Sequence, residues 1–428
     1  MFKESLLDKT LYRVKKFVPK FAFNFFAPFY HTVLAYSGSI FYGNPSKSLK
    51  VIGVTGTKGK STTVFLISKI LESTGVSVAA VGSLGFKLKD KEWPNTLKMT
   101  MPGRFRLQKF FYEAKKAGCK YLVLEVTSEG IKQKRHLGTK FDCAVFTNLH
   151  KEHIESHGSF DNYYRAKQEL FAKTKNIHVL NADDENVGLF SKFSSQRKIF
   201  YGIQGGDMRA QGLELKTDSS SFEVYGTRFN LNLGGRFNVL NCLSALSVVA
   251  MYGVDLPKTK PILESITNIP GRMEFIQKEP FKVVVDYAHT PDSLEAVYKT
   301  LKTDSGRLIC VLGAAGGGRD KWKRSEFGKI AGKYCDEIIL TDEDPFEEDP
   351  EKIIEEIKKG VVKSETVSET RRLEITLDRR EAIKSALTKA GVGDTVVVTG
   401  KGSETSMAVA GGRKIPWSDK QIVRELLK

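Results

Sequence analysis

Residues 51–62, which read VIGVTGTKGKST, decide the fold of this chain. The β-branched run at 51–54 predicts a buried strand, and the apolar residues of 62–73 recur at helical spacing. A glycine-rich turn separates the two, which is the order of a phosphate-binding α/β unit. We therefore expect a mainly parallel sheet built outward from this strand.

The turn itself predicts nucleotide binding. In such a loop, backbone N–H groups point at phosphate oxygens, and the N-terminus of the following helix adds partial positive charge. Lys60 is expected to reach the terminal phosphates and Ser61 to hold Mg²⁺. The pattern is G-T-x-G-K-[ST] rather than G-x-x-x-x-G-K-[ST], because Val54 occupies the first glycine position. The expected nucleotide contacts in the loop are Gly56, Thr57, Lys58, Gly59, Lys60, Ser61 and Thr62.

The following residues alternate between predicted strands and helices. This alternation predicts a mainly parallel sheet with helices on both faces. Residues 207–233 differ, because short alternating stretches at 221–225 and 229–233 predict antiparallel strands at the edge of that sheet. The other strands are expected at 76–81, 121–126, 143–147 and 177–180, and helices at 104–117, 162–172 and 239–251.

A second alternating block begins near Phe275 and predicts a smaller, Rossmann-like α/β domain. The Pro270-Gly271 pair marks the expected boundary. We therefore expect an N-terminal helical segment at 1–49, a central nucleotide-binding domain at 50–270 and a C-terminal domain at 271–428. The last domain is expected to contain strands at 281–286, 308–312, 337–340 and 395–399, and helices at 291–301, 325–333, 350–359 and 379–390.

Composition narrows the class of partners. The 428 residues include 67 Lys and Arg against 50 Asp and Glu, a formal charge of +17. This excess favours anionic partners, but we expect no nucleic acid, because RNA-binding and zinc-finger signatures are missing. The five cysteines include no C-x-x-C pair, and Cys310 lies in an apolar run. We interpret them as small buried residues of a protein in a reducing cytoplasm.

The N-terminal segment has an unusual composition. Residues 21–46 include no Asp, Glu, Lys or Arg, and six aromatic residues crowd into 21–30. The scattered charge before them and the lack of a cleavage site exclude a secretory signal peptide. One interpretation is a pair of short helices packed on the next domain. The alternative is an interfacial aromatic segment, with Lys15, Lys16 and Lys20 facing anionic lipid.

An acid closes the predicted strand at 121–126. Glu125, beside a phosphate loop, is expected to be a second Mg²⁺ anchor, and the alternative is a solvated glutamate at a strand end. The spacing of His150, His153 and His157 places two of them on one helical face, which by itself indicates zinc. The residues alone leave both metals open.

These motifs and several later ones resemble the Mur ligase family, most closely its MurE type. The loop form G-T-x-G-K-[ST] is shared with this family and its folylpolyglutamate synthase relatives. The most specific string is VDYAHTPDSL at 285–294, and the resemblance spans about residues 50 to 428. The other matching strings are EVTSEGIKQKR at 125–135, FTNLHKEHIESHG at 146–158, YRAKQELF at 164–171, NADD at 181–184, GRFNVLNCLSA at 235–245, PGRME at 270–274 and GAAGGGRDKWKR at 313–324.

The resemblance implies ATP and Mg²⁺ as cofactors and gives roles to the matching positions. Glu129 and Glu152 depart from the family, which has His and Asp there. The implied catalytic residues are Lys60, His153, Lys167 and Arg272, and the implied metal ligands are Ser61, Glu125, His153 and Lys167 as a carbamate. The further ATP contacts are Asn241, Arg272, Asp286 and His289, and the substrate contacts are Thr100, Thr127, Ser128 and Arg135.

The incoming amino acid stays open. MurE enzymes that add diaminopimelate contact it with a D-N-P-R motif, and the aligned residues 343–346 read EDPF. Because the arginine that pairs with a carboxylate is missing, the sequence argues against diaminopimelate, and lysine or another amino acid stays open. Asp344 and Glu404 are the expected substrate contacts, with Glu404 binding an amino group.

The resemblance implies an ATP-dependent ligase of peptidoglycan biosynthesis, and thus of cell shape and division. ATP phosphorylates a carboxylate of a UDP-N-acetylmuramoyl peptide, and the amino acid then displaces phosphate from the acyl phosphate. We expect a cytoplasmic monomer, with residues 21–46 as a candidate peripheral contact at the inner face of the membrane.

Alternative functions stay open because MurE proteins carry an N-terminal domain of about a hundred residues, whereas residues 1–49 precede this loop. One alternative is another amide ligase on this scaffold, such as a folylpolyglutamate synthase-like or polymer-extending enzyme. The other is a non-catalytic ATP-binding partner in the cell wall pathway.

Overall fold

The computed structural model describes residues 20–428 apart from 96, 98, 153 and 363–371, and for 20–28 it describes the backbone only. The expected roles of Lys15, Lys16, Lys20 and His153 therefore concern side chains outside the described part. Among the helices described, none combines the length and the apolar character needed to cross a membrane.

A large sheet forms around β1 (Lys50–Thr55), which is buried at every position after Lys50. β1 pairs in parallel with β5 (Tyr121–Glu125) on one side and with β6 (Phe141–Phe146) on the other. The strand order is β4-β3-β2-β5-β1-β6-β7-β8-β9, with antiparallel pairing where β3 joins β2 and β4. The remaining strands are β2 (Val78–Gly82), β3 (Gly85–Leu88), β4 (Lys91–Trp93), β7 (Ile177–Asn181), β8 (Arg197–Gly202) and β9 (Met208–Arg209).

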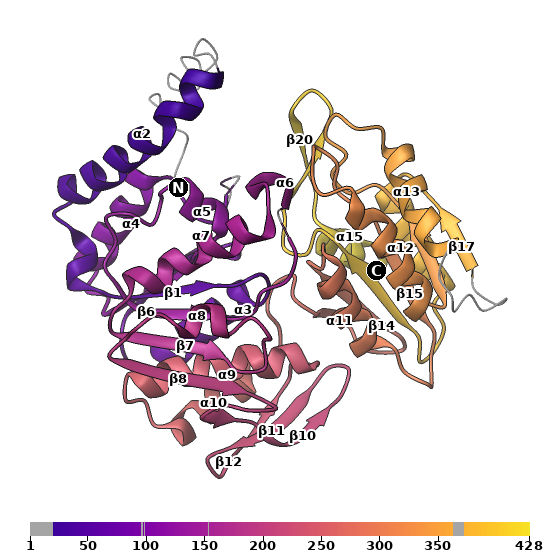
Figure 1. Ribbon diagram of the computed structural model, residues 1–428. Helices are drawn as coiled ribbons and strands as arrows, with labels where there is room; N and C mark the ends of the chain where they lie inside the picture. The colour runs from indigo at the N-terminus through magenta and orange to yellow at the C-terminus, as the bar shows by residue number, and fades with distance from the viewer. Residues whose placement is uncertain (1–19, 96, 98, 153, 363–371) are drawn as a thin grey trace.

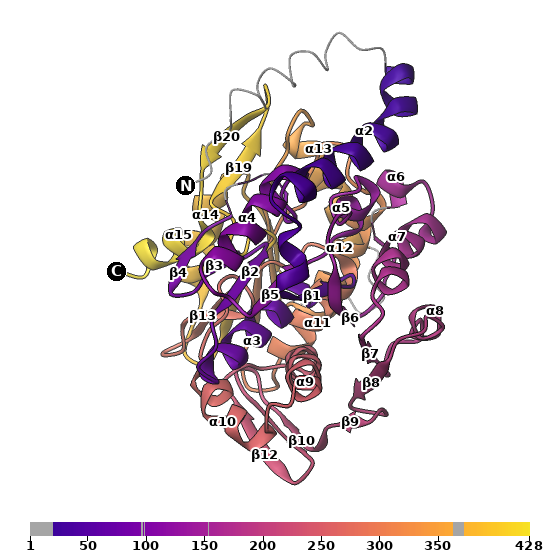
Figure 2. The ribbon, with the colours of Figure 1, turned by 90° about the vertical axis from the view of Figure 1, so that its left-hand side faces the viewer.

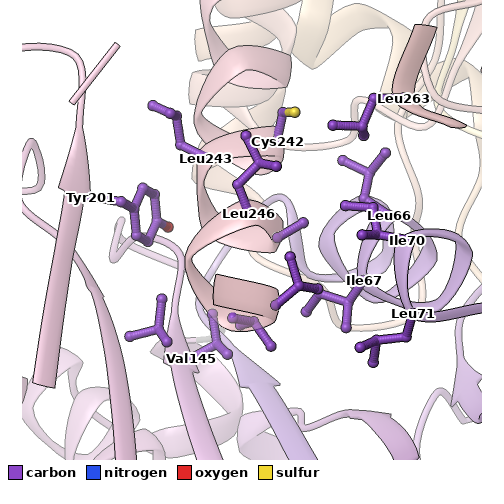
Figure 3. Close-up of a cluster of buried hydrophobic side chains, with 14 of the residues drawn as sticks. Leu66, Ile67, Ile70, Leu71, Val145, Tyr201, Cys242, Leu243, Leu246 and Leu263 are labelled. Atoms are coloured by element: carbon purple, nitrogen blue, oxygen red, sulfur yellow. The ribbon is translucent and has the colours of Figure 1, made fainter. Parts of the chain in front are cut away.

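Helices cover both faces of this sheet (Figure 1). Side chains alternate along β1, so Ile52 packs toward α3 and α9, whereas Val51 packs toward α4 and α7. Figure 3 shows the first cluster, in which Ile67 of α3 and Leu246 of α9 meet above the strands. The helices are α3 (Lys60–Ser73), α4 (Arg104–Lys116), α7 (Phe160–Lys173) and α9 (Arg236–Met251), with the shorter α5 (Ser128–Lys132), α6 (Ile154–His157) and α8 (Gly188–Ser191).

The strands expected at the edge of the large sheet belong to a separate sheet. β10 (Gln211–Leu215), β11 (Ser220–Val224) and β12 (Thr227–Leu231) pair with one another, so the antiparallel pairing is confirmed and the edge position is wrong. The reason is packing: Phe222 and Phe229 join the buried cluster that contains α9. The strands lie against the helix layer, beside α10 (Leu256–Ser265), and do not extend the ladder of the large sheet.

A second α/β unit follows, drawn orange to yellow in Figure 1. Its sheet has the order β13-β14-β18-β15-β16-β17 and is parallel except for the β13–β14 pair. Side chains of α11, α12 and α13 pack on one face, and those of α14 and α15 pack on the other. The bounds are β13 (Glu274–Gln277), β14 (Lys282–Asp286), β15 (Leu308–Leu312), β16 (Glu337–Leu340), β17 (Arg372–Ile375), β18 (Thr395–Thr399), α11 (Pro291–Leu301), α12 (Trp322–Tyr334), α13 (Pro350–Val362), α14 (Arg379–Lys389) and α15 (Asp419–Leu426), with a hairpin of β19 (Ser406–Val409) and β20 (Arg413–Pro416).

Within residues 21–46, whose backbone is described, one long helix takes the place of the pair of short helices that was one expectation. α2 (Lys20–Phe41) continues to Phe41 and is followed by the 3₁₀ turn η1 (Pro45–Ser48). Its inward positions are small and buried: Gly38 lies against Phe105 of α4, and Ala35 and Ser39 lie against Gly138. The packing on the neighbouring unit was predicted correctly, and the number of helices was not.

Two cysteines are joined, which the interpretation as small buried residues in a reducing cytoplasm did not include. Cys310 in β15 and Cys335 after α12 form a disulfide, although both are buried as expected. Cys119, Cys143 and Cys242 are free and buried. The partners are 25 residues apart, and the parallel pairing of β15 with β16, which begins just after Cys335, brings them together.

Candidate active site

A cleft of about 990 Å³ lies between the large-sheet unit and the second unit. Its walls come from loops at the carboxyl ends of parallel strands, where open α/β sheets bind ligands. Of the predicted site residues that are described, Gly56 and Lys167 do not line it: Gly56 belongs to the inner side of the phosphate loop, and Lys167 lies behind it. Those that line it are Thr57, Lys58, Gly59, Lys60, Ser61, Thr62, Thr100, Glu125, Thr127, Ser128, Arg135, Asn241, Arg272, Asp286, His289, Asp344 and Glu404.

The loop between β1 and α3 closes around its own lysine. Lys60 Nζ donates to the carbonyl oxygens of Gly56 over 3.0 Å and of Thr57 over 2.7 Å. Gly59 precedes α3 with a φ of 80°, and a Cβ at this position would overlap Oδ1 of Asn241. Glycine is required there for both reasons. The N-terminus of α3 thereby opens on the cleft, which is the arrangement that binds phosphate.

Ser61 and Glu125 bring a hydroxyl and a carboxylate together. Ser61 Oγ donates to Glu125 Oε2 over 3.0 Å, and Glu125 also accepts from the backbone N–H of Ser83 over 2.8 Å. Mg²⁺ prefers oxygen ligands of this kind, completed by phosphates and water. Within the described residues, no group of three or more His, Cys, Asp or Glu is arranged to hold a metal ion. The donors present therefore fit a metal shared with a phosphate ligand.

The histidines considered for zinc face different partners. His157 Nε2 lies 3.4 Å from Glu129, and His150 Nδ1 lies 3.9 Å from Asp292 on α11. A zinc site needs its ligands to converge on one point. The described histidines give zinc no support, and Glu129, which departs from the family pattern, pairs with His157.

Lys167 lies in the core directly behind the phosphate loop. Its Nζ donates to the carbonyl oxygen of Gly56 over 2.7 Å and lies 4.5 Å from the ring centre of Tyr163. Burial, with the nearby cation of Lys60, holds the pKa of Lys167 well below its usual range. A lowered pKa favours the neutral form of the amine, which is the nucleophilic form.

Residues at the start of the second unit complete the wall opposite the loop. The Arg272 guanidinium stacks 4.4 Å from the ring centre of Tyr287, which orients its planar fork. Asp286 accepts from the backbone N–H of Met273 over 2.7 Å and of Ala288 over 2.6 Å. Burial raises the pKa of Asp286, and these hydrogen bonds oppose that rise.

Glu152 connects the units electrostatically. Its Oε1 lies 3.2 Å from Lys58 Nζ in the phosphate loop, 3.6 Å from His289 Nε2 and 3.9 Å from Lys323 Nζ in the second unit. Burial lowers the pKa of Lys58 to about 8 and that of His289 to about 3. At neutral pH, His289 is therefore uncharged, and the lysines supply the positive charge around Glu152.

The predicted substrate residues of the large-sheet unit form one wall. Arg135 donates to Gln133 Oε1 over 2.6 Å, and burial lowers the pKa of Arg135. A partly desolvated guanidinium attracts carboxylates and phosphates strongly. Thr127 Oγ1 caps α5 by accepting a backbone N–H over 3.1 Å, and Thr100 Oγ1 lies 3.0 Å from Ser83 Oγ.

Carboxylates gather at the end of the cleft formed by the second unit. Lys401 Nζ donates to both oxygens of Asp344, over 2.9 and 2.8 Å, and to Glu404 over 2.5 Å. Glu343 is buried beside them, and burial raises its pKa to about 7. One fully buried lysine therefore faces three acidic side chains at this end.

Sequence reasoning missed Lys401, Glu343 and Arg319. A pattern shows that residues 400–404 form a glycine-containing string, but it does not show that its lysine is buried between carboxylates. The glycine-rich string at 313–324 likewise marks a loop without showing which cation enters the cleft. Arg319 lines the cleft with its guanidinium 5.8 Å from the ring centre of Phe346.

A phosphate loop in one α/β unit faces buried cations and carboxylates of the other across the cleft, which suits an enzyme that acts on a nucleotide and on further charged substrates. Residues 54–249 match the family described as Mur ligase middle domain, and residues 271–402 match the Mur ligase, glutamate ligase domain. The chain belongs to the Mur ligase family, and it is an ATP-dependent ligase that forms amide bonds.

Relatives of the MurE type cover most of the chain. The UDP-N-acetylmuramoyl-L-alanyl-D-glutamate–2,6-diaminopimelate ligase 1 of Clostridium acetobutylicum is 36% identical over 92% of this chain and 81% of the relative. The UDP-N-acetylmuramyl-tripeptide synthetase of a Roseiflexus species is 37% identical over 92% and 81%. The resemblance to this family, predicted from the motifs, is confirmed.

Solved structures agree on the fold. A solved UDP-N-acetylmuramoyl-L-alanyl-D-glutamate–2,6-diaminopimelate ligase superposes with a TM-score of 0.64 at 30% identity, and the match covers 92% of this chain and 82% of that one. MurF of Thermotoga maritima, solved with ADP, gives a TM-score of 0.67 at 21% identity, covering 92% and 83%. At that identity the second likeness shows the fold alone.

Proposed function

We propose that the chain adds an amino acid to a carboxylate of a UDP-N-acetylmuramoyl-peptide-like acceptor through an acyl phosphate. The observation that carries this proposal is the gathering of a phosphate loop, a desolvated arginine wall and an acidic pocket in one cleft. The phosphate loop suits ATP, the arginine suits an anionic acceptor, and the acidic pocket suits an amine. The names of the MurE-type relatives support the choice of acceptor.

In the first step, an oxygen of the acceptor carboxylate attacks the γ-phosphorus of ATP, and the bond to ADP breaks. Negative charge concentrates where nucleophile and phosphate meet, so the barrier is largely electrostatic. Lys60 and Arg272 are proposed to supply the compensating charge, and Arg135 to hold the acceptor by an anionic group. Asn241, Asp286 and the neutral His289 are proposed to line the nucleotide.

Ser61 and Glu125 would hold Mg²⁺, which neutralises phosphate charge when it is bound. From the family resemblance, we propose His153 and a carbamylated Lys167 as further ligands. An unmodified amine that donates to Gly56 is not a metal ligand, but a neutral lysine reacts with carbon dioxide to give a carbamate anion. The lowered pKa of Lys167 supports that modification.

In the second step, the free amine of the amino acid attacks the acyl carbon, and inorganic phosphate leaves. Asp344 and Glu404 are proposed to position the amino acid, with Glu404 binding an ammonium group other than the attacking amine. The carboxylates Glu343, Asp344 and Glu404 outnumber the buried Lys401 beside them. This excess favours a substrate with a second amino group, a feature that lysine and diaminopimelate share.

We also propose a division into a segment at 1–49, a central domain at 50–270 and a C-terminal domain at 271–428. The family matches at 54–249 and 271–402 fall inside this division and support it. A monomer acting in the cytoplasm, with peripheral contact at the inner face of the membrane, completes the proposal.

The test is release of ADP and phosphate by the purified full chain with ATP, Mg²⁺ and UDP-N-acetylmuramoyl dipeptide, across a panel of amino acids. We expect turnover that needs both the acceptor and one amino acid, and a loss of about a thousandfold or more in Lys167→Ala. Turnover with a folate or a polymer acceptor instead would replace the proposed acceptor. ATP binding without amino-acid-dependent phosphate release would favour a non-catalytic partner.

A further inference from the structure

From Phe29 to Ile40, the outer face of α2 carries a row of exposed apolar side chains. Phe29, Val33, Tyr36 and Ile40 follow one another at spacings of four, three and four residues, which places them on one helical stripe. All four are exposed, Phe29 by 72% and Ile40 by 69%. The neighbouring Phe41 is exposed by 74%. Contiguous exposed apolar side chains of this kind mark a surface that interacts with a partner or a membrane.

The exposed face of α4 repeats this spacing with a different composition. Phe105, Lys109, Tyr112 and Lys116 alternate aromatic and basic side chains, and all are exposed. The acid on this helix, Glu113, lies 3.8 Å from Lys109. Interleaved aromatic and basic residues are typical of a surface that meets both acyl chains and anionic headgroups.

The stripes of α2 and α4 form one continuous surface. The ring centres of Phe41 and Phe105 are 6.3 Å apart, and those of Tyr42 and Tyr112 are 5.8 Å apart. Gly38 of α2 packs against the backbone and ring of Phe105. Figures 1 and 2 both show α2 along the outside of the molecule, with its N-terminal end reaching past the neighbouring helices.

The charged residues around this surface indicate whether a membrane or a second copy of the chain covers it. Residues 21–46 contain no charged side chain, whereas residues 1–20 contain six Lys and Arg against two Asp and Glu. Basic residues therefore border the apolar stripe in sequence at its N-terminal side and in space on α4. A hydrophobic strip bordered by positive charge complements the interface of an anionic bilayer.

We propose that the α2–α4 surface docks in the interface of an anionic lipid membrane. The helix lies in the plane of the interface, with its stripe among the acyl chain ends and with Lys109 and Lys116 at the headgroups. None of the described helices can span a bilayer, so docking is peripheral. The proposal does not depend on which acceptor the ligase uses.

Docking on this face has a consequence for the cleft. Arg104, at the start of α4, donates to the backbone carbonyl of Gln133, and Gln133 lines the cleft. Arg135, two residues further on, belongs to the wall proposed to hold the acceptor. The membrane-docked face is thus joined by a direct hydrogen bond to the acceptor side of the active site.

Co-sedimentation with vesicles tests the proposal on the full chain. The probes are vesicles of phosphatidylglycerol and phosphatidylcholine in equal amounts, and vesicles of phosphatidylcholine alone. We expect binding to the first, at least about tenfold weaker binding to the second, and weakening by added salt. Val33→Glu with Ile40→Glu, and separately Lys109→Gln with Lys116→Gln, should each weaken binding by about tenfold or more.

Val392→Glu is the matched control, because Val392 is 87% exposed and lies outside this surface. It should bind vesicles as the unaltered chain does, and all variants should keep ligase turnover on a soluble acceptor. The proposal would be overturned if the Val33→Glu and Ile40→Glu double variant sedimented with the vesicles as much as the unaltered chain does. It would also be overturned if the unaltered chain bound neither kind of vesicle. A dimer in light scattering that this variant dissociates, without vesicle binding, would assign the surface to a second copy instead.

Discussion

Gly59 and Gly75 have the same φ of 80° in different surroundings. A Cβ at Gly75 meets nothing within 4 Å, whereas a Cβ at Gly59 overlaps the side chain of Asn241. Alanine at either position costs about 1 kcal/mol because L-residues disfavour this conformation. We expect Gly59→Ala alone to weaken ATP binding, by about tenfold, since it displaces Asn241 and the end of the phosphate loop.

Thermal unfolding and titration calorimetry with ATP separate these effects. Both variants should unfold at a similarly lowered temperature, and Gly75→Ala should bind ATP like the unaltered chain. If Gly75→Ala weakened ATP binding equally, the close approach of Gly59 to Asn241 would not be the cause.

Glu343 gives the amino acid site a dependence on pH. Burial raises its pKa to about 7, so the carboxyl is mostly charged at pH 8 and mostly neutral at pH 6. The charged form attracts an ammonium group, and we expect KM for the amino acid to rise by up to about tenfold between pH 8 and pH 6. In Glu343→Gln, that part of the rise should vanish and KM should be high throughout.

The measurement is KM for the amino acid and for ATP against pH, in both proteins. The pH dependence of KM for ATP serves as the control, because ATP binds at the other end of the cleft. Parallel amino acid profiles in the two proteins would show that another group titrates.

At the level of elements, α12 and α13 cross at a pair of glycines. A Cβ at Gly360 would overlap the backbone carbonyl of Ser325 and approach Gly328. Backbone cannot move aside as a side chain can, so Gly360→Ala should destabilise the protein by about 1–3 kcal/mol. Gly188 in α8 has open space around it, and Gly188→Ala should change stability by less than about 1 kcal/mol.

Urea denaturation of both variants checks this prediction. Similar midpoints for Gly360→Ala and Gly188→Ala would mean that the helices separate at little cost. The stability lost in Gly360→Ala comes from the larger distance forced between α12 and α13, and not from the removal of a contact.

Elements also differ in how far the sequence predicts them. The strands Leu308–Leu312, Glu337–Leu340 and Thr395–Thr399 have the predicted bounds, because each is a short apolar run with clear breaks on both sides. The sequence correctly predicted antiparallel pairing for β10, β11 and β12, but it wrongly placed them at the edge of the large sheet. Alternation tells which face of a strand is buried, but it does not tell which neighbour buries it.

At the level of the whole molecule, Glu152 holds the units together across the cleft. It faces Lys58 on one side and His289 and Lys323 on the other. Glu152→Gln should widen the cleft and reduce kcat/KM by about tenfold or more, because the reactants are then less well aligned. The radius of gyration from small-angle scattering should increase, and added ATP should partly reverse the increase.

Asp292→Asn is the control for this prediction. Asp292 also faces the other unit, 3.9 Å from His150, but both side chains are largely exposed. An exposed pair contributes little, so this variant should stay within about twofold of the unaltered kcat/KM. Equal losses in both variants would argue against a special role for Glu152.

The sequence by itself determined the phosphate loop, the alternating α/β pattern and the order of the family motifs. These features are local, since each depends on a few consecutive residues whose backbone preferences and side chains act together. The strand, turn and helix at 51–73 are one example, and the family membership follows from strings of the same kind.

Only the tertiary structure decided which distant groups share an environment. It buried Lys401 between Asp344 and Glu404, joined Cys310 to Cys335 and placed α2 against α4. Burial, pKa and charge compensation depend on what surrounds a side chain, and residues far apart in the chain supply those surroundings. The phosphate loop could therefore be predicted from the sequence, whereas the acidic pocket and the joining of the α2 and α4 stripes into one surface depended on packing.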